Sequence, residues 1–495
     1  MPQKPVKIGL INPRMEGPYP PLGLGYISAY LRRYGQHKYD MKIIDGNTSK
    51  DIKKELEDFN PAIVGFTGHS PQILQAVSLS NAIREWRKDI FQIIGGVHAS
   101  ADPCGTLKRG SFDLAVMGEG ENTFMEAVDT YIGGGKDKTR EIKGVAHRRG
   151  DELIINGKRP QIEDLDTIPV PARDLFNMDY YLGLSFGLRG LVRSGVTSIT
   201  GSRGCPYSCS FCGVGIVFKK VRQFSNEYRI AEISELASRY RARALYFADD
   251  TFITNKKNVH AFCESMISAG LNKKVKWTAQ ARANLIDWED VELLKLMKAA
   301  GCIQIEYGFE SGSDYVLSLL KQNKVTVEDN QRAIDVTHRS GLRVLGTFIV
   351  GTPGERVEDL DMTRAFIRKN MDRIDYFQTF ICTPFPGSPI YDTCRERGLV
   401  ETDYFDELEK REKEKGVRVY TDTLPHGLVV ETLKQLDFMG IKKVSLKDRL
   451  IWVLYHLAKA DQDVSHRDRF YIFKRLIFYF TSLFRPSLGA DSKKA

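Results

Sequence analysis

The sequence alternates short apolar runs with helix-length amphipathic segments, and this alternation constrains the fold more than any other feature. Within residues 6–125 there are five runs rich in β-branched residues: VKIGLIN (6–12), DMKIIDG (40–46), AIVGFTG (62–68), IFQIIGG (90–96) and DLAVMGE (113–119). Strands that are apolar throughout are typical of parallel sheets covered by helices on both faces. The pattern therefore predicts an α/β domain with a doubly wound, Rossmann-like sheet of five parallel strands.

The alternation resumes near residue 197 with six further runs: SIT (198–200), ALYFADD (244–250), KWTAQAR (276–282), IQIEYGFE (303–310), RVLGTFIVG (343–351) and DYFQTFICT (375–383). Six such units predict a partial (β/α)6 barrel, with its active site at the C-terminal ends of the strands. The polar residues at those ends are Asp249, Asp250, Gln280, Arg282, Glu310 and Glu355. We expect four regions: the α/β domain (1–140), a linker (141–195), the barrel (196–400) and a helical C-terminal region (401–495).

Charge and cysteine content narrow the class of protein. The net charge is +9, and residues 441–495 carry +7 of it, with twelve Lys and Arg against five Asp and Glu. A basic tail on a nearly neutral chain gives little support to a nucleic-acid groove. Eight cysteines, no secretory leader and no long uncharged apolar stretch predict a cytoplasmic protein without membrane spans. Residues 447–459 and 469–484 are amphipathic, and predict either helices packed on the barrel or a peripheral contact with an anionic membrane.

Three cysteines stand in a loop directly after the first predicted barrel strand. Cys205, Cys209 and Cys212 have the spacing C-x3-C-x2-C. Four thiolates would close a zinc site or a ferredoxin-type cluster, whereas three leave one metal position open for a ligand. The alternative is a zinc knuckle with a distant fourth ligand, but no other His or Cys lies nearby in the sequence. The other five cysteines (Cys104, Cys263, Cys302, Cys382 and Cys394) have no metal-binding spacing.

This motif, in this place, resembles the signature of the radical S-adenosylmethionine (SAM) enzymes, and later segments over residues 195–400 agree with it. Tyr307–Ser311 and Gly346–Glu355 look like strand-end segments of that family. The resemblance implies that the cysteines hold a [4Fe-4S] cluster, and that one-electron reduction of SAM yields a 5′-deoxyadenosyl radical able to attack unactivated carbon. The residues that it implies at the SAM site are Phe211, Gln280, Arg282, Gly308, Glu310 and Gly351.

The N-terminal residues resemble the cobalamin-binding domain that precedes many radical SAM barrels. The matching stretches are residues 20–24, 95–99 and 118–124. The D-x-H-x-x-G motif of classical cobalamin modules is absent, so the resemblance implies a corrinoid without that histidine on cobalt. The alternative is that the glycines form ordinary strand-to-helix turns and the histidines hydrogen-bond in loops. The implied cobalamin-site residues are Thr67, His69, Gly95, Gly96, Val97, His98, Gly118, Glu119 and Gly120.

Together these segments resemble bacteriochlorophyllide and hopanoid methylases and the anaerobic Mg-protoporphyrin ester cyclases. The resemblance implies a cobalamin-dependent C-methyltransferase with an apolar substrate, and we favour a bacteriochlorophyll-type tetrapyrrole. A cyclase or oxidase of a tetrapyrrole or a hopanoid-like lipid is the main alternative. An RNA methylthiotransferase is more remote, because it needs a second cysteine trio and the N-terminal domain holds only Cys104. The expected partners are the small apolar substrate and a low-potential electron donor such as a flavodoxin or ferredoxin, with no nucleic acid.

Overall fold

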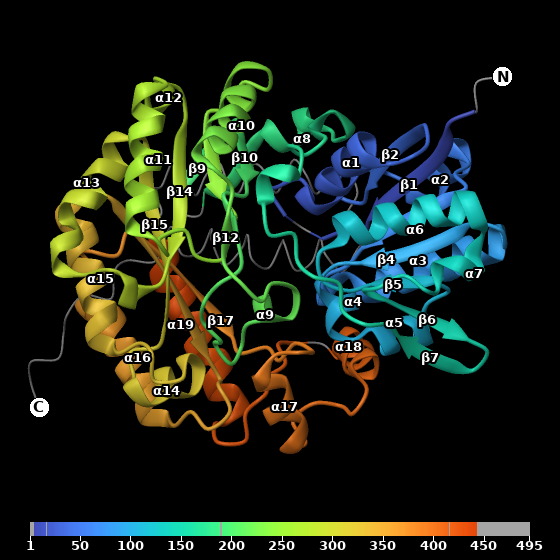
Figure 1. Ribbon diagram of the computed structural model, residues 1–495. Coiled ribbons are helices and arrows are strands. Elements are labelled where there is room, and N and C mark those ends of the chain that lie inside the picture. The colour runs from blue at the N-terminus through green and yellow to red at the C-terminus, as the bar shows by residue number, and fades with distance from the viewer. Residues whose placement is uncertain (1–3, 16, 189–190, 415, 443–495) are drawn as a thin grey trace, which may run out of the picture. The chain divides into compact units, whose positions relative to one another are not determined.

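The computed structural model describes residues 4–15, 17–188, 191–414 and 416–442. Its N-terminal part contains a seven-stranded sheet with the order β2-β1-β3-β4-β5-β6-β7 (Figure 1). The parallel strands are β1 (Val6–Asn12), β2 (Tyr39–Asp45), β3 (Ile63–Thr67), β4 (Phe91–Gly95) and β5 (Leu114–Val116). They correspond to the five predicted apolar runs.

Helices cover both faces of this sheet, as the apolar strands require. One face packs on α1 (Leu22–Tyr34) and α6 (Gly120–Gly134), through a core that includes Leu10, Leu24 and Phe124. The other face carries α2 (Ile52–Phe59), α3 (Ile73–Trp86), α4 (Val97–Ala101) and α5 (Pro103–Arg109). The doubly wound architecture predicted from the sequence is confirmed.

The segment 141–195, predicted as a linker, contains more secondary structure than expected. After α7 (Lys136–Thr139), β6 (Val145–Arg149) and β7 (Glu152–Ile155) form an antiparallel hairpin that extends the N-terminal sheet beyond β5. The strands are only five and four residues long, so their period-2 signal is weak. They are followed by η2 (Leu165–Thr167), η3 (Arg173–Leu175), α8 (Met178–Leu182), and the hairpin β8 (Leu184–Leu188) with β9 (Leu191–Ser194).

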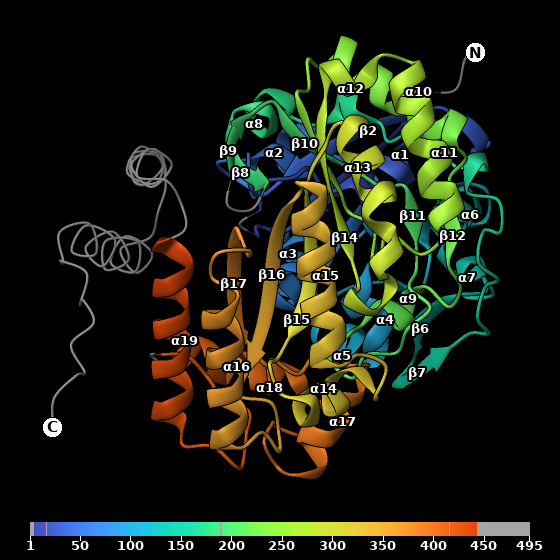
Figure 2. The same cartoon turned by 90° about the vertical axis from the view of Figure 1, so that its left-hand side faces the viewer.

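The second sheet is an open half-barrel of six parallel strands, each paired with the next along the chain (Figure 2). The strands are β10 (Val196–Ile199), β13 (Ala244–Phe247), β14 (Lys276–Ala281), β15 (Cys302–Glu310), β16 (Arg343–Val350) and β17 (Tyr376–Ile381). The outer helices are α10 (Asn226–Ser238), α11 (Lys256–Ser268), α12 (Leu271–Lys274), α13 (Val291–Ala299), α14 (Asp314–Lys321), α15 (Val327–Ser340) and α16 (Val357–Lys369). The predicted partial (β/α)6 barrel is confirmed.

Local sequence signals explain where the barrel helices begin. Ser225, Asn255, Ser313 and Thr326 stand directly before α10, α11, α14 and α15, and each side chain accepts a hydrogen bond from a backbone N–H of the first turn. Alternate strand residues pack outward on these helices, with Trp277 fully buried at the centre of an aromatic cluster. The remaining strand residues line the concave face.

Over the described residues up to 442, the chain after the barrel is helical, as predicted. It forms α17 (Pro389–Glu396), α18 (Tyr404–Lys413) and α19 (His426–Lys442), and α19 packs on β17. Tyr404 and Leu408 of α18 belong to a core that also includes the α3 side of the N-terminal sheet, so both sheets lie within one compact unit over residues 1–443. The amphipathic segments 447–459 and 469–484 lie outside the described residues.

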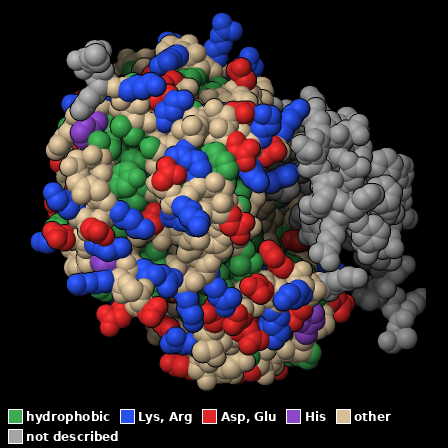
Figure 3. All heavy atoms as spheres, turned by 90° about the vertical axis from the view of Figure 1, so that its right-hand side faces the viewer, with side chains coloured by type: hydrophobic (Ala, Val, Ile, Leu, Met, Phe, Trp, Pro, Cys, Tyr) green, Lys and Arg blue, Asp and Glu red, His purple; other side chains and the backbone are tan. Residues whose placement is uncertain are grey.

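The length and hydropathy of the helices and the distribution of surface charge bear on whether a membrane or another partner could be bound. None of the helices within the described ranges is both long enough and apolar enough to cross a bilayer. On the face at the right of Figure 1, around α2 and α7, basic and acidic side chains are interspersed and the hydrophobic groups form small patches (Figure 3).

Candidate functional site: the cysteine loop and its neighbours

The cysteine loop spans residues 204–213, between the short strand β11 (Ser202–Arg203), which pairs with β12 (Arg222–Gln223), and α9 (Val214–Val217). Gly204 opens it at φ +90°, where a Cβ atom would collide with the carbonyl of Lys220, so the turn requires glycine. Its N–H donates to Asp250 Oδ2 at 2.9 Å. Farther along, Ser210 donates from its backbone N–H and its hydroxyl to carbonyls at the end of α14, each at 2.9 Å. The loop is therefore fixed at both ends by the barrel.

The three thiols are half-buried, and each has a neighbour from the protein. Cys205 Sγ lies 3.6 Å from the Thr251 hydroxyl, and Cys212 Sγ accepts from the N–H of Val214 at 3.5 Å. Cys209 Sγ accepts from Arg282 Nη1 at 2.8 Å. Burial, with smaller contributions from Cys209, Asp250 and Cys205, raises the pKa of the Cys212 thiol to about 11. A metal bound at these three thiols would remove the thiol protons, because a coordinating thiol is deprotonated.

The donor set fits a cluster better than a single ion. Within the ranges that the structure describes, no group of three or more His, Cys, Asp or Glu side chains could hold one metal ion. The thiolates of a [4Fe-4S] cluster need not converge on one point, because each binds its own iron. Cys205, Cys209 and Cys212 would therefore hold three irons, and the fourth would be left for a ligand.

The predicted SAM-site residues gather at the C-terminal ends of β14, β15 and β16. Glu310 has φ +61°, a left-handed conformation unusual for a side chain of this size, at a register shift where β15 pairs with β16. Its carboxylate pairs with the buried Lys321 at 3.2 Å, and Lys321 Nζ also donates to the carbonyl of Gly308 at 2.6 Å. Gln280 donates to the hydroxyl of Tyr246. Lys321 had no signal of its own in the sequence, because its partners stand on another element.

The turn after β16 is built around a buried carboxylate. Glu355 Oε2 accepts from the backbone N–H groups of Gly351 at 2.7 Å and Thr352 at 3.0 Å. Burial raises the pKa of Glu355 to about 7 despite these two hydrogen bonds. Gly351 has φ +77°, so a glycine is needed to present this turn. Phe211, also predicted at the SAM site, is half-buried beside the core that contains Ile349 and Cys382.

The predicted cobalamin residues at β3 and β4 form one edge of the N-terminal sheet. Thr67, Gly95, Gly96 and Val97 are all partly exposed at the C-terminal ends of these strands or just beyond. Gly96 has φ +100°, and a Cβ there would lie 2.8 Å from the carbonyl oxygen of Gly68. Glycine is therefore required at position 96, where the connections after β3 and β4 approach each other closely.

The two predicted histidines differ in their surroundings. His98 is fully buried: its Nδ1 lies 3.0 Å from the Ser70 hydroxyl and its ring packs against Tyr404 and Phe405. Burial lowers the pKa of His98 to about 4. His98 thus lies in α4 with a hydrogen bond of the kind that the alternative interpretation expects. His69 is exposed, and desolvation by the surrounding protein lowers the pKa of its imidazole.

The segment after β5 is tied by buried ion pairs to β11 and β12, the two short strands beside the cysteine loop. Glu119 accepts from Arg203 and Arg222, each at 2.8 Å, and from the N–H of Ile162 at 3.0 Å, while Arg203 also pairs with Glu121 at 2.6 Å. Although burial opposes ionisation, the guanidinium groups hold the pKa of Glu119 below its usual value. Gly118 and Gly120 flank this carboxylate. Sequence reasoning missed Arg203 and Arg222, because Arg203 lies 84 positions after Glu119 and no motif links them.

The loop at Gly95–Val97 of the N-terminal sheet and the cysteine loop of the half-barrel lie side by side. Helix α4, which starts at Val97, contacts α9, which starts just after Cys212. A Cβ on Gly213 would lie 3.8 Å from Val97 Cγ1. The structure thus brings the predicted cobalamin edge and the predicted cluster site into direct contact.

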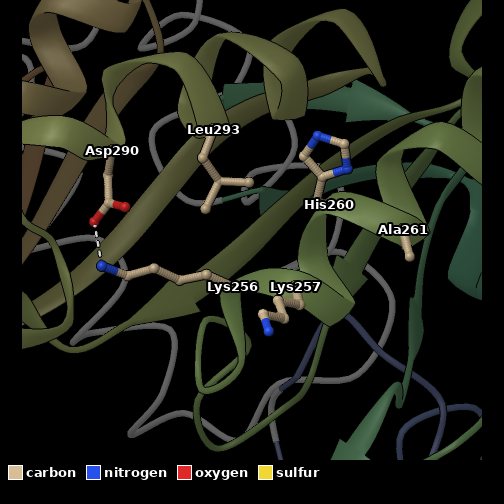
Figure 4. A pocket seen from close by; sticks show the side chains of 6 residues that line it. All are labelled: Lys256, Lys257, His260, Ala261, Asp290 and Leu293. Carbon is tan, nitrogen blue, oxygen red and sulfur yellow. Dashed lines mark ion pairs between the residues drawn. The ribbon is translucent and has the colours of Figure 1, made fainter.

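A separate surface pocket lies outside this region, between α11 and α13. Figure 4 shows Lys256, Lys257, His260, Ala261, Asp290 and Leu293 around it. Lys256 is already paired with Asp290 at 2.7 Å. None of the predicted site residues lines this pocket.

Comparison with known proteins gives concordant results. A family model of the radical SAM superfamily matches residues 199–367, and one of the B12 binding domain matches residues 10–128. The chain is 33% identical over 394 residues to an uncharacterised methyltransferase of Pyrococcus horikoshii, covering 77% of this chain and 80% of that protein. It is 28% identical to the anaerobic magnesium-protoporphyrin IX monomethyl ester cyclase of Cereibacter sphaeroides, covering 77% of this chain and 61% of the cyclase.

Among solved structures, the chain resembles a radical SAM methyltransferase of Kitasatospora setae with cobalamin and a [4Fe-4S] cluster bound. The TM-score is 0.65 at 19% identity, covering 80% of this chain and 78% of the other, which supports the fold. The two family models, together with the cysteine loop, assign a [4Fe-4S] cluster, SAM and cobalamin as cofactors. The chain therefore belongs to the B12-binding radical SAM enzymes and is related to the class B methyltransferases.

Proposed function

We propose that this enzyme is a C-methyltransferase that acts at an unactivated carbon of an apolar substrate, with a bacteriochlorophyll-type tetrapyrrole as the first candidate. The observation that carries the proposal is the contact between the loop at Gly95–Val97 and the cysteine loop. When bound, the cluster with SAM supplies a carbon-centred radical and the corrinoid supplies a methyl group. Methyl transfer to a substrate radical needs both groups at one site, and these adjacent loops support that arrangement.

Residues of the two sheets bind different cofactors. Cys205, Cys209 and Cys212 hold the cluster, and the strand ends around Glu310 and Gly351 hold SAM. The corrinoid would lie at the strand ends around Gly95 and Gly96, two partly exposed residues without side chains. Since the half-barrel is open, substrate reaches the same edge from the concave face.

The concave face offers apolar surface for the substrate. Phe380 is 45% exposed near the C-terminal end of β17 and pairs in register with Ile349. Phe377, an odd number of positions earlier, packs in the helix-covered core, so strand alternation places Phe380 on the opposite, concave side. Gln378 and Thr347, cross-strand neighbours on the same side and half-buried, add polar groups that could orient the substrate. An exposed aromatic side chain above polar groups supports a largely apolar substrate with a few polar substituents.

A second candidate is cyclisation or oxidation of a tetrapyrrole or a hopanoid-like lipid. The similarity to a cyclase named for a magnesium-protoporphyrin ester favours it. An RNA methylthiotransferase has no such support, because the N-terminal sheet region contains only Cys104. We propose in either case that a low-potential carrier such as a flavodoxin or ferredoxin supplies electrons.

The test compares reaction products formed with SAM that carries a deuterated methyl group. Protein reconstituted with iron, sulfide and cobalamin is incubated with the labelled SAM, a low-potential one-electron reductant, and pigment and lipid extracts from a strain lacking the gene. The products are analysed by mass spectrometry. A methyltransferase yields a product that contains the labelled methyl group, which Cys209→Ala protein does not form. Consumption of a substrate without incorporation of label would contradict methyl transfer and support the cyclase or oxidase.

A further inference from the structure

Arg282, at the end of β14, is held against the cysteine loop by hydrogen bonds from all three of its guanidinium nitrogens. Nη1 donates to Cys209 Sγ at 2.8 Å, Nε donates to Asn284 Oδ1 at 3.0 Å, and Nη2 donates to the carbonyl of Lys321 at 3.5 Å. The residue is only 5% exposed. A buried guanidinium with this many fixed partners keeps one orientation, and that orientation points one nitrogen at a cluster ligand.

The cysteine loop itself adds a fourth contact. The Tyr207 ring lies under the guanidinium, with 4.0 Å from Arg282 Cζ to the ring centroid. Tyr207 stands between Cys205 and Cys209, so one loop supplies both the metal ligands and an aromatic face for the cation. Such cation–π contacts are stronger when desolvated. The planar, permanently charged fork of arginine suits this combination of stacking and hydrogen bonding, whereas a lysine could not reproduce it.

We propose that Arg282 is a positioning residue that acts through Cys209 to raise the reduction potential of the cluster. Reduction takes one electron from a low-potential carrier, adds one negative charge to the metal–thiolate group, and neither forms nor breaks a bond. A cation that donates to a ligand sulfur stabilises the more negative, reduced state more than the oxidised state. Because the Arg282 guanidinium is buried, water screens its charge less than it would at the surface. This role is separate from the SAM contact predicted for Arg282, and does not depend on the substrate or on methyl transfer.

The test is a redox titration of the full-length protein, followed by the electron paramagnetic resonance (EPR) signal of the reduced cluster. The cluster is reconstituted, and SAM, cobalamin and substrate are left out, so that only the protein surroundings set the potential. Arg282→Gln should lower the equilibrium constant for reduction at least tenfold, which is about 59 mV for a one-electron couple, at unchanged iron content. Arg282→Lys should fall between this variant and the wild type. The matched control is Arg239→Gln, which removes one positive charge from a side chain that is 60% exposed; its potential should equal that of the wild type.

Two further variants keep Arg282 but each removes one contact that fixes its orientation. Asn284→Ala removes the partner of Nε, and Tyr207→Leu removes the aromatic face. Each should lower the reduction potential, as Arg282→Gln does, but by less. If Arg282→Gln protein fails to retain iron, these two variants test the proposal in its place. A wild-type potential in iron-replete Arg282→Gln protein would overturn the proposal. So would wild-type potentials in both Asn284→Ala and Tyr207→Leu if the glutamine variant loses its cluster.

Discussion

At the scale of single residues, the chemistry-bearing side chains were visible in the sequence but the groups that hold them were not. Cys205, Cys209 and Cys212 were found because their spacing is local. Arg282 was predicted at the SAM site, but its hydrogen bond to Cys209, 73 positions earlier, was not, and neither was the ion pair of Lys321 with Glu310. Short motifs thus reveal ligands, whereas the charges that tune those ligands depend on tertiary structure.

The first prediction concerns the cluster ligands. Replacement of Cys205, Cys209 or Cys212 by Ala should abolish the brown absorbance of the cluster and reductive cleavage of SAM, because two thiolates do not retain the cluster. Cys263→Ala is the matched control, since this thiol belongs to α11, is fully buried in the barrel core and has no metal-binding spacing. Iron content by chemical assay decides the matter, and full iron in any one of the three variants would refute the assignment.

The second prediction concerns the buried Glu355. Its folded-state pKa of about 7 lies above the ordinary value of 4.5, so the folded protein binds more protons than the unfolded chain between these values. Stability should therefore fall as pH rises through this window, by on the order of 3 kcal/mol. Glu355→Gln cannot ionise and should lose that part of the pH dependence.

Urea midpoints at pH 5 and pH 8 measure this difference. The exposed control Glu396→Gln should keep the wild-type pH dependence. If Glu355→Gln responded to pH as the wild type does, the raised pKa of Glu355 would be wrong.

At the scale of elements, each predicted strand of both sheets is present, because runs of β-branched residues are a strong local signal for buried parallel strands. The hairpin β6–β7 was missed, since two short strands leave little periodicity to read. The burial of His98 could not be predicted either. Its place directly after Gly95-Gly96-Val97 suggested the ligand-binding edge of the sheet, whereas Tyr404 and Phe405, about 300 residues later, pack against its ring.

The third prediction tests the ion pairs between the loop after β5 and strands β11 and β12. Glu119→Ala should lower stability by about 3–5 kcal/mol, because it leaves Arg203 and Arg222 buried without this partner. Glu163→Ala breaks a pair with Lys220 in which both side chains are about two-thirds exposed, and should cost at most about 1 kcal/mol. Thermal and urea unfolding would measure both. Equal, small losses in the two variants would show that Glu119 does not link the elements.

At the scale of the whole molecule, the proposed cobalamin and cluster sites form one shared site at the edges of the two sheets. The sequence predicted both modules and their order along the chain. It could not predict that α4 of the first would contact α9 of the second, because that contact arises from packing between segments more than 100 residues apart. The adjacency is what turns two cofactor-binding modules into one candidate centre for methyl transfer.

The central claim, that cobalamin and the cluster lie next to each other, can be measured without knowing the substrate. Cob(II)alamin and the reduced cluster are both paramagnetic, and their dipolar interaction falls steeply with distance. We predict that reduction of the cluster broadens the cob(II)alamin EPR signal and speeds its relaxation in the wild-type protein, whereas Cys212→Ala protein loaded with cob(II)alamin shows neither effect. A cob(II)alamin signal that is the same in the two proteins, with both cofactors fully bound in the wild type, would contradict the shared site.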